Sequence, residues 1–271
     1  MKKLILHLGV HKTATTYVQS KIYNSREVLS QAGIGCINLD DTRKYFTSKI
    51  TRSPSISKEA KSFLDSHDVI LLSDENILGG TDKPISQLVY PDGAERVKRL
   101  LKKLSPDSFE LHLTIRDPEA YLVSRYCEYL RHYPFLDIHH YFDELFVKEF
   151  SWLPLINELQ KVAGQDIKVT PFEAVFNDER AYFEYLIGKD LDLVPAADDP
   201  AVRRSKISQE AYETLLMVSQ HFPGHMIRKM MTMIGNNKQL SRKTPLRPFS
   251  KQLSKRLQEN YEADKKDLGL I

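Results

Sequence analysis

The chain has 271 residues, 41% of them hydrophobic and 28% charged, with a formal net charge of +3. This composition is ordinary for a globular protein, and so small a positive charge does not indicate a nucleic-acid partner. No apolar run approaches the length of about 18 residues that a membrane span requires, so we expect no transmembrane segment. Cys36 and Cys127 have neither metal-ligand spacing nor the pattern of a disulfide framework, which favours a reducing, cytoplasmic location.

The first feature of the chain is an apolar run at residues 4–8 that turns at Gly9 and leads into a helix. Basic and hydroxyl-bearing side chains crowd the connection, which contains His11, Lys12, Thr13, Ala14, Thr15 and Thr16. At a helix N-terminus the backbone N–H groups lack partners inside the helix, and the helix dipole favours an anion. A strand, a glycine turn and a lysine beside such a terminus therefore predict an anion-binding loop.

This loop differs from a Walker A motif, in which glycine directly precedes the lysine. Here His11 precedes Lys12, and Gly9 lies farther back. An ordinary strand–turn–helix connection with a capping threonine is the simplest alternative. It does not account for a lysine and several threonines within residues 12–16, so the sequence predicts an anion site of another type.

Further strands are predicted at residues 67–75, 109–115 and 167–172, with helical stretches between them, and Gly33 and Gly35 are expected to bracket a turn. The predicted helices span residues 15–29, 58–65, 91–104, 117–131, 182–187, 208–221 and 250–266, and residues 141–160 are predicted to be largely helical with a break near Pro154. This alternation predicts an α/β fold of three layers, with a mostly parallel central sheet flanked by helices. We expect one domain over residues 1–271, with an α/β core at 1–190 and a mainly helical, basic C-terminal part at 200–271.

Two more polar clusters follow predicted strands. Ser73, Asp74 and Glu75 come at the end of the second strand, and Arg116 and Asp117 follow the third. In parallel α/β sheets, ligands bind beyond the carboxyl ends of the strands. Both clusters should therefore lie beside the loop at residues 11–16, and this shared edge of the sheet is the predicted active site.

The Lys-Thr-x-Thr-Thr pattern at residues 12–16 resembles the 5′-phosphosulfate loop of sulfotransferases that use PAPS (3′-phosphoadenosine 5′-phosphosulfate), which reads PKTGTT or HKTGTT. Ala14 stands where that family has glycine, and alanine carries a steric cost if the position requires a positive φ. A second motif of the family, RxPxxxxxSxY, is matched by Arg116, Pro118, Ser124 and Tyr126. The resemblance covers about the first 130 residues in detail, and weaker similarity follows at residues 170–173 and 203–208.

This resemblance implies a P-loop NTPase-like sulfotransferase fold and an enzyme that transfers the sulfuryl group of PAPS to a hydroxyl or amine. It implies that PAPS is held by Gly9, His11, Lys12, Thr13, Ala14, Thr15, Thr16, Arg116 and Ser124. Lys12 would stabilise charge on the bridging oxygen, Arg116 and Ser124 would hold the 3′-phosphate, and Glu75 would act as the general base. Asp74 and His11 are the alternative bases. No metal is expected, because a lysine suffices for a sulfuryl group of single charge.

The sequence leaves the acceptor open: a carbohydrate, a lipid and a small alcohol all fit. Residues 226–256 contain many lysines and arginines and no acid, which indicates either a solvated basic face or a rim for an anionic acceptor or membrane surface. The apolar residues 69–72 before Asp74 and Glu75 also resemble a Walker B strand, so a P-loop kinase or NTPase using Mg-ATP is a second hypothesis. A non-catalytic nucleotide-binding protein of the same fold is a third. The oligomeric state cannot be read from the sequence.

Overall fold

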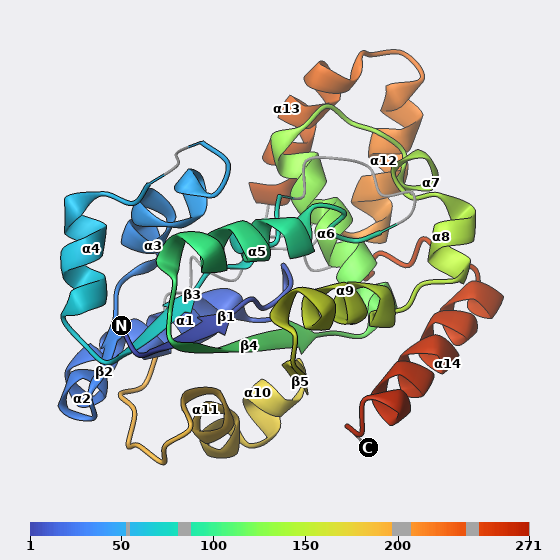
Figure 1. Cartoon of the computed structure of the whole chain (residues 1–271). Coiled ribbons are helices and arrows are strands. Elements are labelled where there is room, and N and C mark those ends of the chain that lie inside the picture. Colours follow the sequence, from blue (N-terminus) through green and yellow to red (C-terminus); the bar gives the residue numbers. More distant parts are fainter. Residues whose placement is uncertain (53–54, 81–87, 197–206, 237–243, 271) are drawn as a thin grey trace.

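The computed structural model describes residues 1–52, 55–80, 88–196, 207–236 and 244–270. Its centre is a five-stranded sheet in the order β2-β3-β1-β4-β5, and every neighbouring pair of strands is parallel (Figure 1). The strands are β1 (Lys3–His7), β2 (Ile34–Cys36), β3 (Val69–Ser73), β4 (Ser108–Ile115) and β5 (Lys168–Pro171). The predicted α/β fold with a parallel sheet is therefore confirmed at this level.

Strand β2 was not predicted, because Gly33 and Gly35 indicated a turn. Gly33, with φ 81°, does turn the chain, but Gly35 lies within the strand. A Cβ atom at Gly35 would come within 2.7 Å of the His67 ring, so close packing against a side chain explains this glycine. A strand as short as β2 carries too few residues for a periodic signal.

The sheet is covered on both faces, because successive buried side chains of a strand point to opposite faces. Leu4 and Leu6 of β1 belong to one apolar cluster, which includes side chains of α5 (Gly93–Leu104) and α9 (Leu153–Ala163). Ile5 belongs to a second cluster with side chains of α1 (Thr15–Asn24) and α11 (Glu179–Ile187). Successive residues of a strand point to opposite faces, so these two clusters form the two interfaces of a three-layer fold.

The remaining helical elements lie between the strands and in the C-terminal part of the chain. They are α2 (Arg26–Gln31), α3 (Leu39–Tyr45), η1 (Thr47–Lys49), α4 (Lys58–Asp65), η2 (Glu75–Ile77), α6 (Pro118–His132), α7 (Ile138–Tyr141), α8 (Glu144–Lys148), α10 (Ala174–Asn177), α12 (Gln209–Ser219), α13 (Gly224–Asn236) and α14 (Lys251–Asp267). The predicted helix at 15–29 is interrupted at Ser25. Residues 141–160 do contain a break, but it lies between α8 and α9, and Pro154 is in the first turn of α9. Helix α13 was not predicted.

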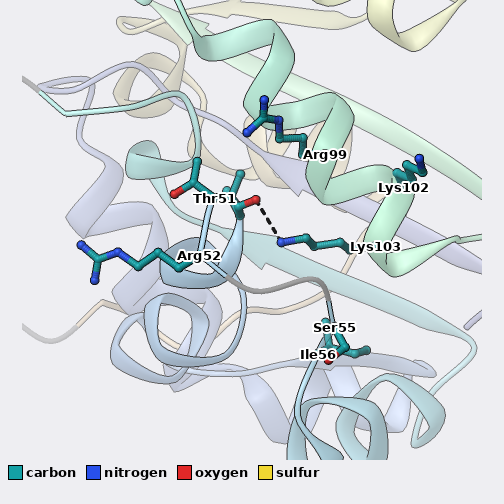
Figure 2. A pocket seen from close by; sticks show the side chains of 8 residues that line it. Thr51, Arg52, Ser55, Ile56, Arg99, Lys102 and Lys103 are labelled. Atoms are coloured by element: carbon teal, nitrogen blue, oxygen red, sulfur yellow. Dashed lines mark hydrogen bonds between the residues drawn. The ribbon is translucent and has the colours of Figure 1, made fainter.

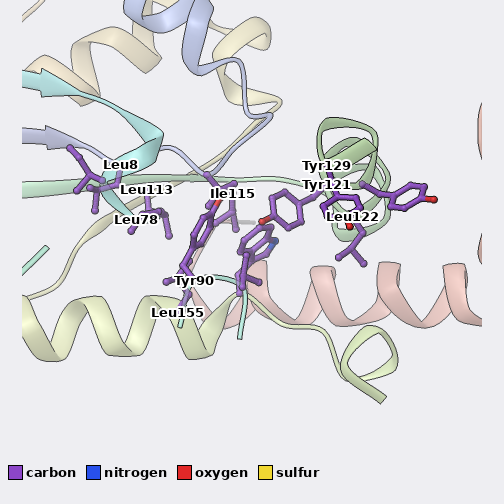
Figure 3. Close-up of a cluster of buried hydrophobic side chains, with 14 of the residues drawn as sticks. Leu8, Leu78, Tyr90, Leu113, Ile115, Tyr121, Leu122, Tyr129 and Leu155 are labelled. Carbon is purple, nitrogen blue, oxygen red and sulfur yellow. The ribbon is translucent and has the colours of Figure 1, made fainter. Parts of the chain in front are cut away.

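The C-terminal helices pack on α6, the helix that leaves the sheet after Arg116. Both α13 and α14 contact α6, and the Tyr212 ring of α12 lies 6.1 Å from the Tyr126 ring. Figure 3 shows the core beneath this region, with Tyr121 on the α6 side and Tyr90 and Ile115 near the end of the sheet. Within the described part of the chain, no helix is both long enough and apolar enough to cross a membrane.

Candidate active site at the carboxyl edge of the sheet

The predicted polar clusters follow neighbouring strands in register. His7, the last residue of β1, is paired with Ser73 of β3 and with His112 of β4. Beyond the strands, the N–H of Val10 donates to the Thr114 carbonyl at 3.2 Å. The loop after β1 therefore lies between the segments that carry Glu75 and Arg116, as the sequence predicted from parallel topology.

The loop is closely packed and has an unusual backbone. A Cβ atom at Gly9 would lie 2.7 Å from the Thr15 side chain, so glycine allows the loop to approach the start of α1. Lys12 and Ala14 have positive φ values of 73° and 56°. Between them Thr13 is fully buried, and its hydroxyl donates to the Val10 carbonyl at 2.6 Å. Left-handed residues of this kind occur in the backbone nests that bind anions.

Unpaired backbone donors give the loop the chemistry that an anion requires. Among the described residues, no group accepts a hydrogen bond from the N–H groups of Thr13, Ala14, Thr15 and Thr16. Thr16 is exposed, whereas Thr15 is buried. Since N–H groups at a helix start carry partial positive charge, an anion placed there would satisfy them.

The left-handed conformation of Ala14 leads to a prediction about stability. A Cβ in this conformation costs roughly 1–2 kcal/mol, and glycine avoids the cost. Ala14→Gly should therefore raise the free energy of unfolding by about 1 kcal/mol, measured by urea denaturation. Ala263→Gly on the exposed face of α14 is the control, and it should lower stability by roughly 0.5–1 kcal/mol. Destabilisation by both substitutions would show that Ala14 is not strained.

Lys12 forms an ion pair that the sequence did not predict. Its Nζ lies 2.6 Å from Oε2 of Glu128, a residue of α6 whose side chain is 11% exposed. The same carboxylate accepts from Arg131 at 2.7 Å and from His132 at 3.2 Å. Three basic groups thus surround one carboxylate at the mouth of the loop. Glu128 follows Ser124 by one helical turn, and that spacing was the signal that could have identified it.

Arg116 is fixed against the loop. Its Nη1 donates to the Lys12 carbonyl at 2.6 Å, and its guanidinium lies 4.5 Å from the centre of the Phe172 ring. Burial lowers its pKa, although the carboxylates of Glu173 and Asp117 act in the opposite direction. Ser124 is nearly buried, and within the described residues its hydroxyl has no hydrogen bond. Of the two residues expected to hold a 3′-phosphate, Arg116 thus lies at this edge, directly after β4, and among the described residues no hydrogen bond joins it to Ser124.

Glu75 and Asp74 share one cation but differ in access. Arg43 of α3 donates to Glu75 at 3.0 Å and to Asp74 at 3.3 Å. Asp74 is fully buried, caps η2 and accepts from the Thr47 hydroxyl at 2.6 Å. Burial raises its pKa. The carboxylate oxygens of Asp74 therefore make hydrogen bonds that support the structure.

The carboxylate of Glu75 remains partly accessible, with 13% of its side chain exposed. Gln19 of α1 donates to its Oε2 at 3.0 Å. Burial opposes ionisation, but the interaction with His11, hydrogen bonds from the backbone and from Gln19, and the charge of Arg43 together lower the pKa of Glu75. An ionised carboxylate beside the loop could accept a proton. Glu75 does not pair with Lys12, which contacts Glu128 instead.

His11 is held on both ring nitrogens. Nδ1 lies 2.7 Å from the Tyr90 hydroxyl, and Nε2 lies 3.1 Å from the side chain of Asn76. With the Asn76 amide turned so that its nitrogen faces His11, its oxygen accepts from Arg43 at 2.8 Å. Burial lowers the pKa of His11 to about 4. A neutral His11 with these contacts holds the loop to η2.

Several parts of the prediction lie beyond what the structure describes. These are residues 203–206 of the family-like segment and Lys238, Arg242 and Lys243 of the basic stretch. Elsewhere in that stretch, Arg228 of α13 donates to the His132 carbonyl at 3.0 Å. The sequence did not indicate Arg43, Asn76 and Tyr90, because none of these residues is itself part of a recognisable motif.

Comparison with known proteins identifies no family for this chain. No protein-family model, no curated protein and no solved structure matches the chain.

Proposed function

We propose that this protein is a sulfotransferase that moves the sulfuryl group of PAPS to a hydroxyl or amine of an acceptor. The observation that carries the proposal is the loop between β1 and α1. It combines unpaired N–H groups, two left-handed residues and Lys12 at the carboxyl edge of a parallel sheet. Arg116 touches this loop directly, and Glu75 is linked to α1 through Gln19.

The residues at the loop fit the 5′ end of PAPS. The N–H groups of residues 13–16 and the exposed Thr16 can donate to the 5′-phosphate, while the buried Thr13 shapes the loop. When PAPS binds, Lys12 must leave the carboxylate of Glu128 and contact an oxygen of PAPS instead. Arg131 and His132 would keep Glu128 paired after that exchange, so the exchange leaves no isolated charge.

In the proposed reaction, the acceptor oxygen or nitrogen attacks sulfur in line, and the bond from sulfur to the 5′-phosphate oxygen breaks. The proton of the acceptor passes to the Glu75 carboxylate, which is the base with the best access. Lys12 stabilises the negative charge that develops on the leaving oxygen. Arg116 and Ser124 are the groups proposed for the 3′-phosphate, and no metal is assigned a role.

A kinase or NTPase using Mg-ATP remains the competing function. Its Walker B carboxylate would be Asp74, whose oxygens accept from Thr47, Arg43 and the N–H of Asn76. A guanidinium and a magnesium ion would compete for the same carboxylate. These contacts favour the sulfotransferase over the Mg-ATP enzyme.

Nucleotide selectivity tests the proposal. The protein should bind 3′-phosphoadenosine 5′-phosphate (PAP) about tenfold to a hundredfold more tightly than adenosine 5′-phosphate, because a charge-assisted contact to the 3′-phosphate contributes about 1.5–3 kcal/mol. Calorimetry with both nucleotides measures the ratio. Arg116→Gln should reduce it, whereas Arg180→Gln, at an exposed ion pair on α11, should not. Equal affinities, or a preference for ATP with magnesium, would contradict the proposal.

A further inference from the structure

Arg125 of α6 is a buried cation that the proposed reaction does not use. Only 2% of the residue is exposed, and its Nε has no hydrogen-bond partner. Its Nη1 donates to the Tyr121 hydroxyl at 3.3 Å, and its guanidinium lies 5.6 Å from the centre of the Tyr90 ring. Within the part of the chain that the structure describes, no carboxylate forms an ion pair with it. Because an arginine keeps its proton in proteins, a full positive charge is buried here without an opposite charge.

Packing alone does not explain a charge at this position. The groups around the guanidinium are the phenols of Tyr121, Tyr141 and Tyr90, and a phenol carries no negative charge at neutral pH. Tyr90 and Tyr121 belong to the core shown in Figure 3. A buried charge is costly unless an opposite charge or several hydrogen bonds replace the water that it loses, and an apolar side chain of similar volume fills such a space at lower cost. The charge of Arg125 therefore calls for a role other than filling the core.

The nearest acid along α6 is already neutralised by other groups. Glu128 lies one helical turn beyond Arg125, and its side chain is 11% exposed. Its carboxylate pairs with Lys12 at 2.6 Å, with Arg131 at 2.7 Å and with His132 at 3.2 Å. With these three partners, Glu128 does not cancel the charge of Arg125, and this part of α6 keeps a positive potential.

The charge of Arg125 acts on the candidate anion loop. The Tyr90 hydroxyl accepts from the backbone N–H of His11 at 3.0 Å and lies 2.7 Å from Nδ1 of the His11 ring. A single phenol thus separates the guanidinium from the loop. Burial is the main cause of the low pKa of His11, the charge of Glu75 opposes it, and the charge of Arg125 adds to it. The field of Arg125 therefore reaches the loop at residues 11–16.

Exposed cations of this protein differ from Arg125 in how strongly water screens them. Figure 2 shows Arg99, Lys102 and Arg52 around an open pocket beside α5. Arg99 and its partner Glu95 are each about half exposed. Water and salt screen such charges, whereas a buried charge is screened much less. Arg125 can therefore attract an anion that it does not touch.

We propose that Arg125 determines the specificity of the loop for highly charged nucleotides: its buried charge favours PAPS over less charged nucleotides without contacting them. The inference rests on the proposed function and adds a residue that selects the donor. At 2% exposure the guanidinium is closed off from a ligand, so the selection acts through the electrostatic field. An anion at the loop also supplies the opposite charge that the protein does not give to Arg125.

The test compares ligands of different charge. PAP carries about four negative charges and adenosine 5′-phosphate about two, since each phosphate monoester contributes between one and two at pH 7. The interaction with a fixed charge is proportional to the charge of the ligand. Arg125→Met should therefore bind PAP at least tenfold more weakly, but adenosine 5′-phosphate only about threefold more weakly, as measured by calorimetry. Equal losses for the two nucleotides would indicate a distorted loop and would overturn the proposal.

Two further variants of Arg125 separate its charge from its shape. Arg125→Lys keeps the charge and should bind PAP within about threefold of the wild type. Binding of Arg125→Lys as weak as that of Arg125→Met would overturn the proposal, because shape and not charge would then matter. Arg125→Gln is also neutral but can still donate to Tyr121, so it repeats the ligand comparison if Arg125→Met does not fold. Thermal unfolding identifies the folded variants.

The matched control is Arg52→Met, which removes the same charge from an exposed position at the pocket of Figure 2. This variant should bind both nucleotides like the wild type. A loss of PAP affinity as large as in Arg125→Met would mean that net charge and not the buried position sets the affinity, and it would overturn the proposal.

The wild-type protein separates this inference from the proposed function. A wild type that prefers PAP to adenosine 5′-phosphate, with an unchanged preference in Arg125→Met, would refute the role of Arg125 alone. A wild type that prefers ATP with magnesium to PAP would refute the sulfotransferase. In that case the role of Arg125 in selecting PAPS would be refuted as well, even if its replacement weakened ATP more than adenosine 5′-phosphate.

Discussion

Replacing Lys12 by alanine should lower the rate of sulfuryl transfer by about 10²- to 10³-fold, because a positive charge aimed at the leaving oxygen typically contributes that much. The fold should survive, since Glu128 keeps Arg131 and His132 as partners. The measurement is the release of PAP from PAPS in the presence of a panel of hydroxyl and amine acceptors. Circular dichroism and thermal unfolding report the fold.

The matched control for Lys12→Ala is Lys61→Ala, which removes the same side chain from an exposed position on α4. This control should transfer at the wild-type rate. Turnover of Lys12→Ala close to wild type would remove Lys12 from the mechanism. A wild-type protein that binds PAP tightly but releases none from PAPS with any acceptor would instead support a non-catalytic nucleotide-binding protein.

Replacing Glu75 by glutamine should lower turnover by about 10²- to 10⁴-fold while PAP affinity stays nearly unchanged. Glutamine keeps the size of the side chain and can still accept from Arg43 through its amide oxygen, but it cannot take the proton of the acceptor. The separation of turnover from affinity is the diagnostic result. Loss of packing alone would change both.

Asp74→Asn distinguishes the two neighbouring acids. Asp74 is buried, caps η2 and accepts from Thr47, so its replacement should lower stability more than it lowers the rate of the folded protein. The opposite pattern, in which Glu75→Gln works within a few-fold of wild type and Asp74→Asn is inactive, would assign the base to Asp74. Thermal unfolding and the transfer rate, measured for both variants, distinguish these two outcomes.

The sequence alone was enough to predict the parallel α/β framework and the place of the site. Strands β1, β4 and β5 lie within or close to the predicted apolar runs, and β3 forms the middle of the run at 67–75. Parallel strands require crossovers, and crossovers bring the carboxyl ends of neighbouring strands to one edge. The loop after β1 and Arg116 could therefore be placed at that edge from local patterns alone.

The sequence also indicated where helices begin when a capping side chain precedes an apolar pattern. Asp117 accepts from the N–H of Ala120, Ser208 from that of Ala211 and Ser250 from that of Leu253. These contacts join residues three apart in the sequence, so a single sequence contains all that they require. Strand β2 and helix α13 were missed because short or weakly patterned segments depend on the surfaces against which they pack.

Only the tertiary structure decided which charges pair within the site. Lys12 contacts Glu128, which lies 116 positions away, and Arg43 bridges Asp74 and Glu75 from a separate helix. The sequence contains many acids and bases that could pair, and their local spacing says nothing about partners on other elements. A charge removed from water needs a nearby opposite charge or hydrogen bonds. The positions of α3 and α6 beside the site determine which group can supply them.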